Sequence, residues 1–129
     1  MAMLKKVKGN YSNDNVIQNL VGYILNFDKM PHRIFGGQGI FIYDAARNIK
    51  IVNRMFCISG KQAEHYVLSF TESEINNLSA KTLLYLGYEI CGYFENRQAV
   101  FACHEEKDDP EFYSNRSYVH IHFVVSTCN

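Results

Sequence analysis

The chain has 129 residues, which suits one domain with a real hydrophobic core and is short for two. Hydrophobic residues make up 47% and charged residues 20%, a globular balance that argues against disorder. Thirteen basic residues offset thirteen acidic ones, so net charge gives no support to a strongly basic nucleic-acid binder. No apolar run resembles a secretory signal or approaches the roughly 20 residues of a membrane span, which predicts a cytoplasmic protein without membrane contact.

The four cysteines form no CxxC pair and suit no zinc knuckle; they are Cys57, Cys91, Cys103 and Cys128. We expect reduced, mostly buried thiols. Cys103 precedes His104, but neighbours on a strand point to opposite faces, which argues against a Cys–His nucleophile.

The N-terminal part is predicted to hold a short strand and one helix. Residues Leu4–Lys8 fit the strand, and Ser12 or Asn13 can cap a helix that runs to about Asn26. The apolar residues of this helix recur at helical spacing and form one stripe: Val16, Ile17, Leu20, Val21, Ile24 and Leu25. Tyr23 lies at the edge of the stripe, where its ring can rest on the core while its hydroxyl reaches solvent.

The next segment is less regular. Phe27–Gly39 contains a proline and three glycines and is predicted to be a loop, followed by a short strand at Gly39–Tyr43. Between Asp44 and Gly60 the pattern leaves open whether Ile49–Val52 and Arg54–Ile58 are strands or parts of a helix.

The second half is predicted to alternate strands with a helix. His65–Phe70 fits a strand, and Thr71-Glu72-Ser73-Glu74 is a capping box that begins a helix ending near Gly92. Gln98–His104 and Tyr118–Ser126 are further strands, separated by a polar loop. We expect these last two strands to be neighbours, with Ile121 and Phe123 facing the helix. The fold class is α/β (α+β), an antiparallel sheet with helices packed on one side, in a single domain over residues 1–129.

The tripeptide His120-Ile121-His122 lies in the last predicted strand. Residues two apart on a strand share a face, so both imidazoles can reach one ion, while Ile121 faces the core. His104, at the end of another strand, can supply a third ligand if the strands are adjacent. Three imidazoles leave coordination positions open, as in catalytic metal sites, and suit zinc or manganese better than magnesium. The alternative to a metal site is that the two histidines occur by chance on a polar strand face.

Two further histidines carry weaker signals. His65 could be a fourth polar group in the site or an edge histidine, and the sequence favours the edge position. His32, next to Pro31 in the predicted loop, receives no role.

Three blocks in this order resemble one family, the relaxases of plasmids and conjugative elements within the HUH endonucleases. Gly22-Tyr23-Ile24-Leu25-Asn26-Phe27-Asp28-Lys29 is similar to the family's tyrosine block, and His65-Tyr66-Val67-Leu68-Ser69-Phe70 is similar to its H-x-x-x-S-F block. His104 with His120-Ile121-His122 resembles its metal block. The resemblance extends over nearly the whole chain.

The resemblance implies a mobilisation nuclease that nicks single-stranded DNA at an origin of transfer and leaves a covalent 5′-phosphotyrosine. Tyr23 would be the nucleophile, with Tyr11 in reserve, and the three histidines would hold a divalent metal, Mg or Mn with Zn as the alternative. DNA contacts would come from Ser69, Lys29, Lys5 and Lys6. Accessory mobilisation proteins are further expected partners in conjugation.

This sequence also departs from the family's pattern. The gap between His104 and His120 is longer than usual and contains the acidic Glu105–Arg116 loop, and Ser126 stands where the family usually has asparagine. Family members continue beyond the point where this chain ends, which predicts either a C-terminally truncated fragment or a naturally short relative.

Three other functions would compete with nicking as an explanation of these residues. Single-tyrosine transposases keep a tyrosine after the histidine pair, and none follows Tyr118; histidine-triad hydrolases need a histidine where Val124 stands. The remaining alternative is a degenerate relaxase-like module that binds DNA, metal or a partner without cutting.

Overall fold

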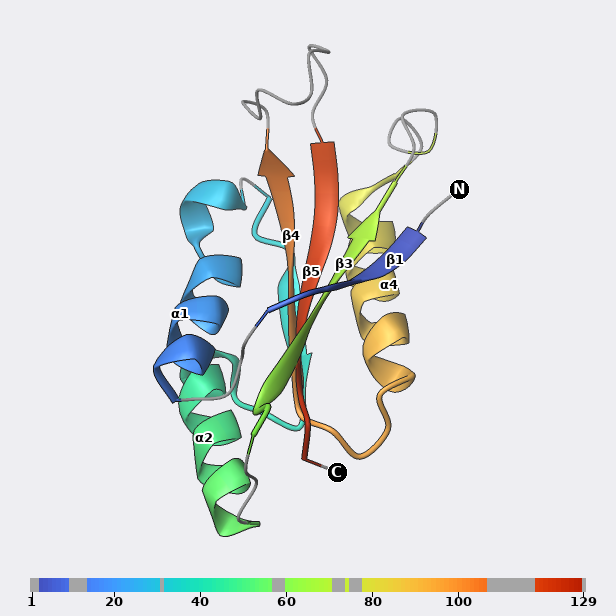
Figure 1. The fold of residues 1–129 in the computed structure, drawn as a ribbon. Coiled ribbons are helices and arrows are strands. Elements are labelled where there is room, and N and C mark those ends of the chain that lie inside the picture. Colours follow the sequence, from blue (N-terminus) through green and yellow to red (C-terminus); the bar gives the residue numbers. More distant parts are fainter. Residues whose placement is uncertain are drawn as a thin grey trace.

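A single antiparallel sheet forms the centre of the protein. The computed structural model describes residues 3–9, 14–30, 32–56, 60–70, 74, 78–106 and 118–128. Its strands pair in the order β1-β3-β5-β4-β2 and comprise β1 (Met3–Val7), β2 (Phe35–Gln38), β3 (Ala63–Ser69), β4 (Ala99–Glu106) and β5 (Tyr118–Ser126). β5 therefore lies between β3 and β4 in the middle of the sheet (Figure 1). The predicted bounds of β5 are confirmed, and those of β1, β3 and β4 shift by at most two residues.

Helices cover both faces of this sheet. α1 (Asp14–Ile24) and α2 (Ala45–Met55) lie on one side, and α4 (Ala80–Gly92) lies on the other (Figure 1). The antiparallel α+β class is confirmed, whereas the expectation of helices on one side is wrong. The reason is that β4 and β5 are apolar on both faces: Val100 and Val124 pack toward α1, while Phe101 and Phe123 pack toward α4. Each apolar face must be buried by helices of its own.

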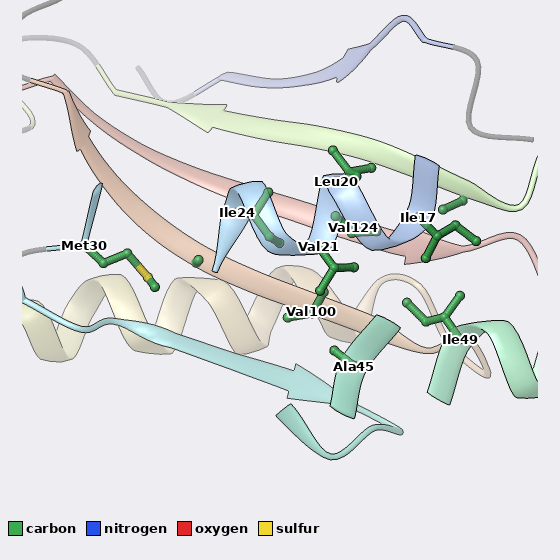
Figure 2. Close-up of a cluster of buried hydrophobic side chains, with 11 residues drawn as sticks. Ile17, Leu20, Val21, Ile24, Met30, Ala45, Ile49, Val100 and Val124 are labelled. Carbon is green, nitrogen blue, oxygen red and sulfur yellow. The ribbon is translucent and has the colours of Figure 1, made fainter. Parts of the chain in front are cut away.

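The core on the α1 side is built from the stripe predicted for the first helix. Ile17, Leu20, Val21 and Ile24 pack with α2 and the sheet through Ala45, Ile49, Val100 and Val124 (Figure 2). α2 settles the segment that the sequence left open, because Ala45, Ile49 and Asn53 are buried at a spacing of four residues. The predicted caps Ser12 and Asn13, and the reserve tyrosine Tyr11, lie outside the described residues.

Strand β2 corrects the predicted loop and the predicted strand at Gly39–Tyr43. The strand is Phe35–Gln38, paired with β4, and Ile42–Asp44 is a short 3-10 helix (η2). A Cβ at Gly36 would stand 2.6 Å from the Tyr88 hydroxyl oxygen and 2.9 Å from the Phe101 ring. The glycine is there because α4 and the core approach the strand closely, and not because the chain turns.

Helix α4 is shorter than predicted. Ser79 caps it by accepting a hydrogen bond from Thr82 N at 3.1 Å, and Leu78 and Ser79 are not helical, so one unbroken helix from Glu72 to Cys91 is wrong. The capping-box residues Thr71–Ser73 lie outside the described residues. Ile121 and Phe123 do pack on α4, as predicted.

Three of the cysteines are free, buried thiols, as expected: Cys91, Cys103 and Cys128. Burial raises the pKa of Cys91 and of Cys103 to about 12. Cys103 faces the α4 side and His104 the α1 side, which supports excluding a thiol nucleophile there. Cys57 lies outside the described residues.

Candidate active site

Two neighbouring strands bring three histidines to one face of the sheet. His104 of β4 and His120 of β5 are direct cross-strand partners, and His122 shares their face two residues along β5. The ring centroids of His104 and His122 are 4.3 Å apart, and those of His120 and His122 are 6.4 Å apart. The alternation of β5 and its pairing with β4 therefore gather the three side chains that the sequence singled out.

His104 is fully buried beneath α1. Its Nε2 donates a hydrogen bond to the carbonyl oxygen of Ile24 at 2.7 Å. Ile24 is the last residue of α1, where carbonyl groups lack an intrahelical partner. A carbonyl can only accept, so Nε2 carries the proton and the lone pair of the neutral ring is on Nδ1.

His65 belongs to the same cluster. It is buried on β3, and its Nε2 lies 3.0 Å from Nδ1 of His122, with the two rings stacked at 5.2 Å. β3 lies between β1 and β5, so the edge position favoured from the sequence is wrong. The available signal was alternation: His65 shares a face with Ser69, which was already a candidate.

Tyr23 stands over the histidines at the edge of α1. The residue is 40% exposed, and its ring meets His104 and His122 edge-on, at centroid distances of 5.4 and 5.7 Å. Lys29, in the 3-10 helix η1 (Phe27–Lys29), places its Nζ 5.1 Å from the Tyr23 ring centroid. A partly exposed tyrosine, two imidazoles and a cation are thus within one small region.

An open cavity of about 580 Å³ joins this region to β1. It is bordered by polar residues from four segments and a few aliphatic ones: Lys5, Lys6, Val7, Lys8, Tyr23, Val67, Ser69, His120 and His122. None of the described residues that border it is acidic. The cavity can therefore accept an anionic group next to the Tyr23 ring.

The relaxase family model, "MobA/VirD2-like, nuclease domain", matches residues 23–129. The chain belongs to the relaxase family. The matched span starts at Tyr23 and includes all four clustered histidines, while β1 and its lysines precede it. No curated protein and no solved structure matches the chain. No helix in the described part of this relaxase domain has the length and apolar character needed to cross a membrane.

Two buried imidazoles of the candidate site, those of His65 and His122, are held neutral near pH 7. Burial, with a contribution from His104, lowers the pKa of His65 to about 4. Burial, followed by the neighbouring histidines and Lys29, lowers the pKa of His122 to about 2. Neutral imidazole is the form that binds metals.

The lysines of β1 differ in where they point. Lys5 pairs in register with Val67, which in turn pairs with His122, so Lys5 lies on the histidine face. Lys6 is on the opposite face and its Nζ forms an ion pair with Glu64. Lys8, directly after β1, also borders the cavity.

The acidic loop begins on the far side of the sheet. Glu105 pairs in register with Val119 on the α4 side and lies 2.8 Å from Nδ1 of His32. Its charge is therefore directed away from the cavity. Residues 107–117 of the loop lie outside the described residues.

Ser126, which replaces the expected asparagine, is buried at the end of β5. Its hydroxyl donates to Oδ1 of Asn53 in α2 at 3.1 Å. This contact ties the end of the strand to a helix and lies away from the residues that border the cavity.

The histidines fit a divalent metal in their chemistry. His104 donates through one ring nitrogen to a carbonyl, and metal-bound histidines commonly do so while the other nitrogen ligates. Among the described residues, no three histidine, cysteine or acidic side chains are already arranged to hold an ion. A metal would have to draw His104, His120 and His122 together.

Proposed function

We propose that this relaxase domain is a metal-dependent endonuclease that nicks single-stranded DNA at an origin of transfer through Tyr23. The observation that carries the proposal is the placement of Tyr23, which borders the same cavity as His120 and His122 and contacts two of the histidine rings. In the proposal Tyr23 is the nucleophile, and the histidines of the sheet hold the metal that acts on the phosphate.

The reaction exchanges one phosphate ester for another. The Tyr23 oxygen forms a bond to phosphorus, the bond from phosphorus to the 3′ oxygen breaks, and the proton of the phenol is matched by one taken up by the leaving 3′ oxygen. The products are a 5′-phosphotyrosine and a free 3′-OH, and the reversal needs no further reactant. Because a free phenol has a pKa near 10, it needs help to act as an oxyanion. In the proposal Lys29, whose Nζ lies 5.1 Å from the centroid of the Tyr23 ring, supplies positive charge beside the reacting groups.

His104, His120 and His122 would hold the divalent ion. When bound, the ion would neutralise charge on the phosphate oxygens and orient the phosphate for in-line attack. Three imidazoles favour manganese or zinc, and magnesium is the hard-ion alternative that the family suggests. The position of the His104 ring in the site is fixed, because its Nε2 donates a hydrogen bond to the Ile24 carbonyl oxygen at the end of α1.

The DNA strand would follow the cavity from Tyr23 toward β1. Lys5 and Lys8 can neutralise backbone phosphates there, and the Ser69 hydroxyl can donate to one. Lys29 would contact DNA from the Tyr23 side. The ion pair with Glu64 makes Lys6 the weakest contact of the proposed set.

The test is a covalent trap. The protein is mixed with Mn²⁺ and a random-sequence pool of single-stranded oligonucleotides that carry a fluorophore at the 3′ end, because the 3′ fragment is the one that Tyr23 would retain. We expect a labelled protein band that survives denaturation, and sequencing of the trapped strands identifies the nick site. Tyr23→Phe removes the attacking oxygen and should abolish the band while leaving oligonucleotide binding unchanged.

Other outcomes separate the alternatives. A band that persists in Tyr23→Phe and is lost in Tyr11→Phe would move the nucleophile to Tyr11. Binding of Mn²⁺ and DNA without any band, from the pool or from oligonucleotides tiling a native transfer origin, would identify a module that binds without cutting.

A further inference from the structure

His65 is a buried polar side chain for which the proposed reaction has no use. It does not border the cavity, so it cannot contact a phosphate there directly. The Nε2 atom of His65 lies 3.0 Å from Nδ1 of His122. Its contact is thus with a proposed metal ligand.

One proton is shared between these two rings, and its position decides what His122 can do. If His122 donates from Nδ1, its lone pair is on Nε2 and can bind a metal. If His65 donates instead, the lone pair of His122 at Nδ1 is consumed by that bond and its Nε2 carries a proton. Only the first tautomer leaves His122 able to ligate.

His104 offers a comparison within the same site. Its proton is fixed on Nε2 because the partner is the Ile24 carbonyl, which cannot donate. The partner of His122 is an imidazole, which can donate or accept. The tautomer of His122 therefore depends on how its partner is protonated, in a way that the tautomer of His104 does not.

We propose that His65 is a positioning residue that accepts the Nδ1 proton of His122 and so presents the Nε2 of His122 to the metal. The inference rests on the proposed metal site, and it adds a residue that acts through His122 and does not bind metal or DNA. The stacking of the two rings, with 28° between their planes, also restricts rotation of His122. Partners of this kind typically contribute 10- to 100-fold to metal affinity.

The experiment measures Mn²⁺ affinity by calorimetry in three variants, without DNA. His65→Leu removes the acceptor, and we expect affinity to fall by about 10- to 100-fold. His65→Gln offers a carbonyl oxygen near the position of Nε2, and it should restore most of the loss. Val124→Ala is the control for packing, because Val124 is the buried register partner of His65 and has no polar group. It should lower stability and leave the affinity unchanged.

A second measurement tests the tautomer without any substitution. In the Zn²⁺-loaded wild-type protein, long-range proton–nitrogen correlation spectra should show His122 protonated at Nδ1 and His65 unprotonated at Nε2. The reverse pattern would overturn the proposal, as would wild-type affinity in His65→Leu or an equal loss in His65→Gln.

The outcome is separable from that of the nicking proposal. Wild-type protein that binds Mn²⁺ but forms no DNA adduct would overturn nicking alone, and the three variants would still decide the role of His65. Wild-type protein that binds neither Mn²⁺ nor Zn²⁺ would overturn the metal site and the role of His65 together.

Discussion

The imidazole of His104 is joined to the main chain of Ile24 by a 2.7 Å hydrogen bond between Nε2 and the carbonyl oxygen. This bond links the central sheet to the end of the helix that carries Tyr23, one residue before Ile24. The same side chain that is proposed to hold a metal therefore also fixes the helix of the proposed nucleophile. Substitutions at His104 should show both effects.

We expect His104→Ala to destabilise the fold more than His120→Ala does. His104 is fully buried and its loss leaves a cavity and an unsatisfied carbonyl, at a cost of about 2–4 kcal/mol. His120 is half-buried at the cavity, and its loss should cost less than about 1 kcal/mol. Urea unfolding of the metal-free variants measures both. Equal destabilisation would contradict the anchoring role of His104.

Two helical glycines should respond in opposite directions to alanine. A Cβ at Gly87 in α4 would stand 2.2 Å from Cε2 of the buried Phe101 ring, so Gly87→Ala should cost about 1–3 kcal/mol. A Cβ at Gly22 in α1 meets no described atom within 4 Å, and Gly22→Ala should stabilise by about 0.5–1 kcal/mol. Thermal or urea unfolding distinguishes the two. A stable Gly87→Ala variant would show that α4 can move away from the sheet.

The sequence predicted most of the sheet because its central strands carry local signals. β5 alternates histidines with core residues from Val119 to Phe123, and this pattern indicates a strand there. β2 was missed because Gly36 and Gly37 suggest a loop, and the role of Gly36 depends on the closeness of Tyr88, which lies far along the chain. α2 stayed ambiguous because Asn53 interrupts its apolar stripe, and what makes Asn53 acceptable inside is bonding to Gln62 and Ser126.

The sequence likewise predicted one part of the candidate site and could not predict another. Face sharing by His120 and His122 follows from the period of a strand. The contact between His65 and His122 requires β3 to lie next to β5, and strand order is a property of the whole fold. The environments of Lys5 and Lys6 likewise depend on how β1 pairs with β3, which the local sequence does not reveal.

The ion pair of Glu64 should give a pH-dependent contribution to stability. The hydrogen bond from Lys6, aided by the charges of Lys6 and Arg97, holds the pKa of Glu64 below its ordinary 4.5. The unfolded chain then binds the proton more readily, so the contribution is present above pH 4.5 and is lost as pH falls through the folded-state pKa. Glu64→Gln should be less stable than wild type by at most about 1 kcal/mol near neutral pH. In urea titrations the difference should shrink as pH is lowered below 4.5. A difference that stays constant as pH falls would assign the effect to packing.

The last prediction uses Lys5 and Lys6 as a matched pair on one strand. Both lysines border the cavity, but Lys5 lies on the histidine face, whereas the Nζ of Lys6 is engaged by Glu64 on the other face. If single-stranded DNA follows the cavity, Lys5→Gln removes one phosphate contact. The plot of log affinity against log salt should then become less steep by about 0.7, which is equivalent to about fivefold weaker binding at 0.1 M salt. Lys6→Gln should change slope and affinity much less, because the charge it removes is already paired. Fluorescence anisotropy with a mixed-sequence single-stranded oligonucleotide over a range of salt concentrations measures both. Equal effects of the two substitutions would mean that DNA contacts the edge of β1 and not the cavity, since the two side chains share an edge but not a face.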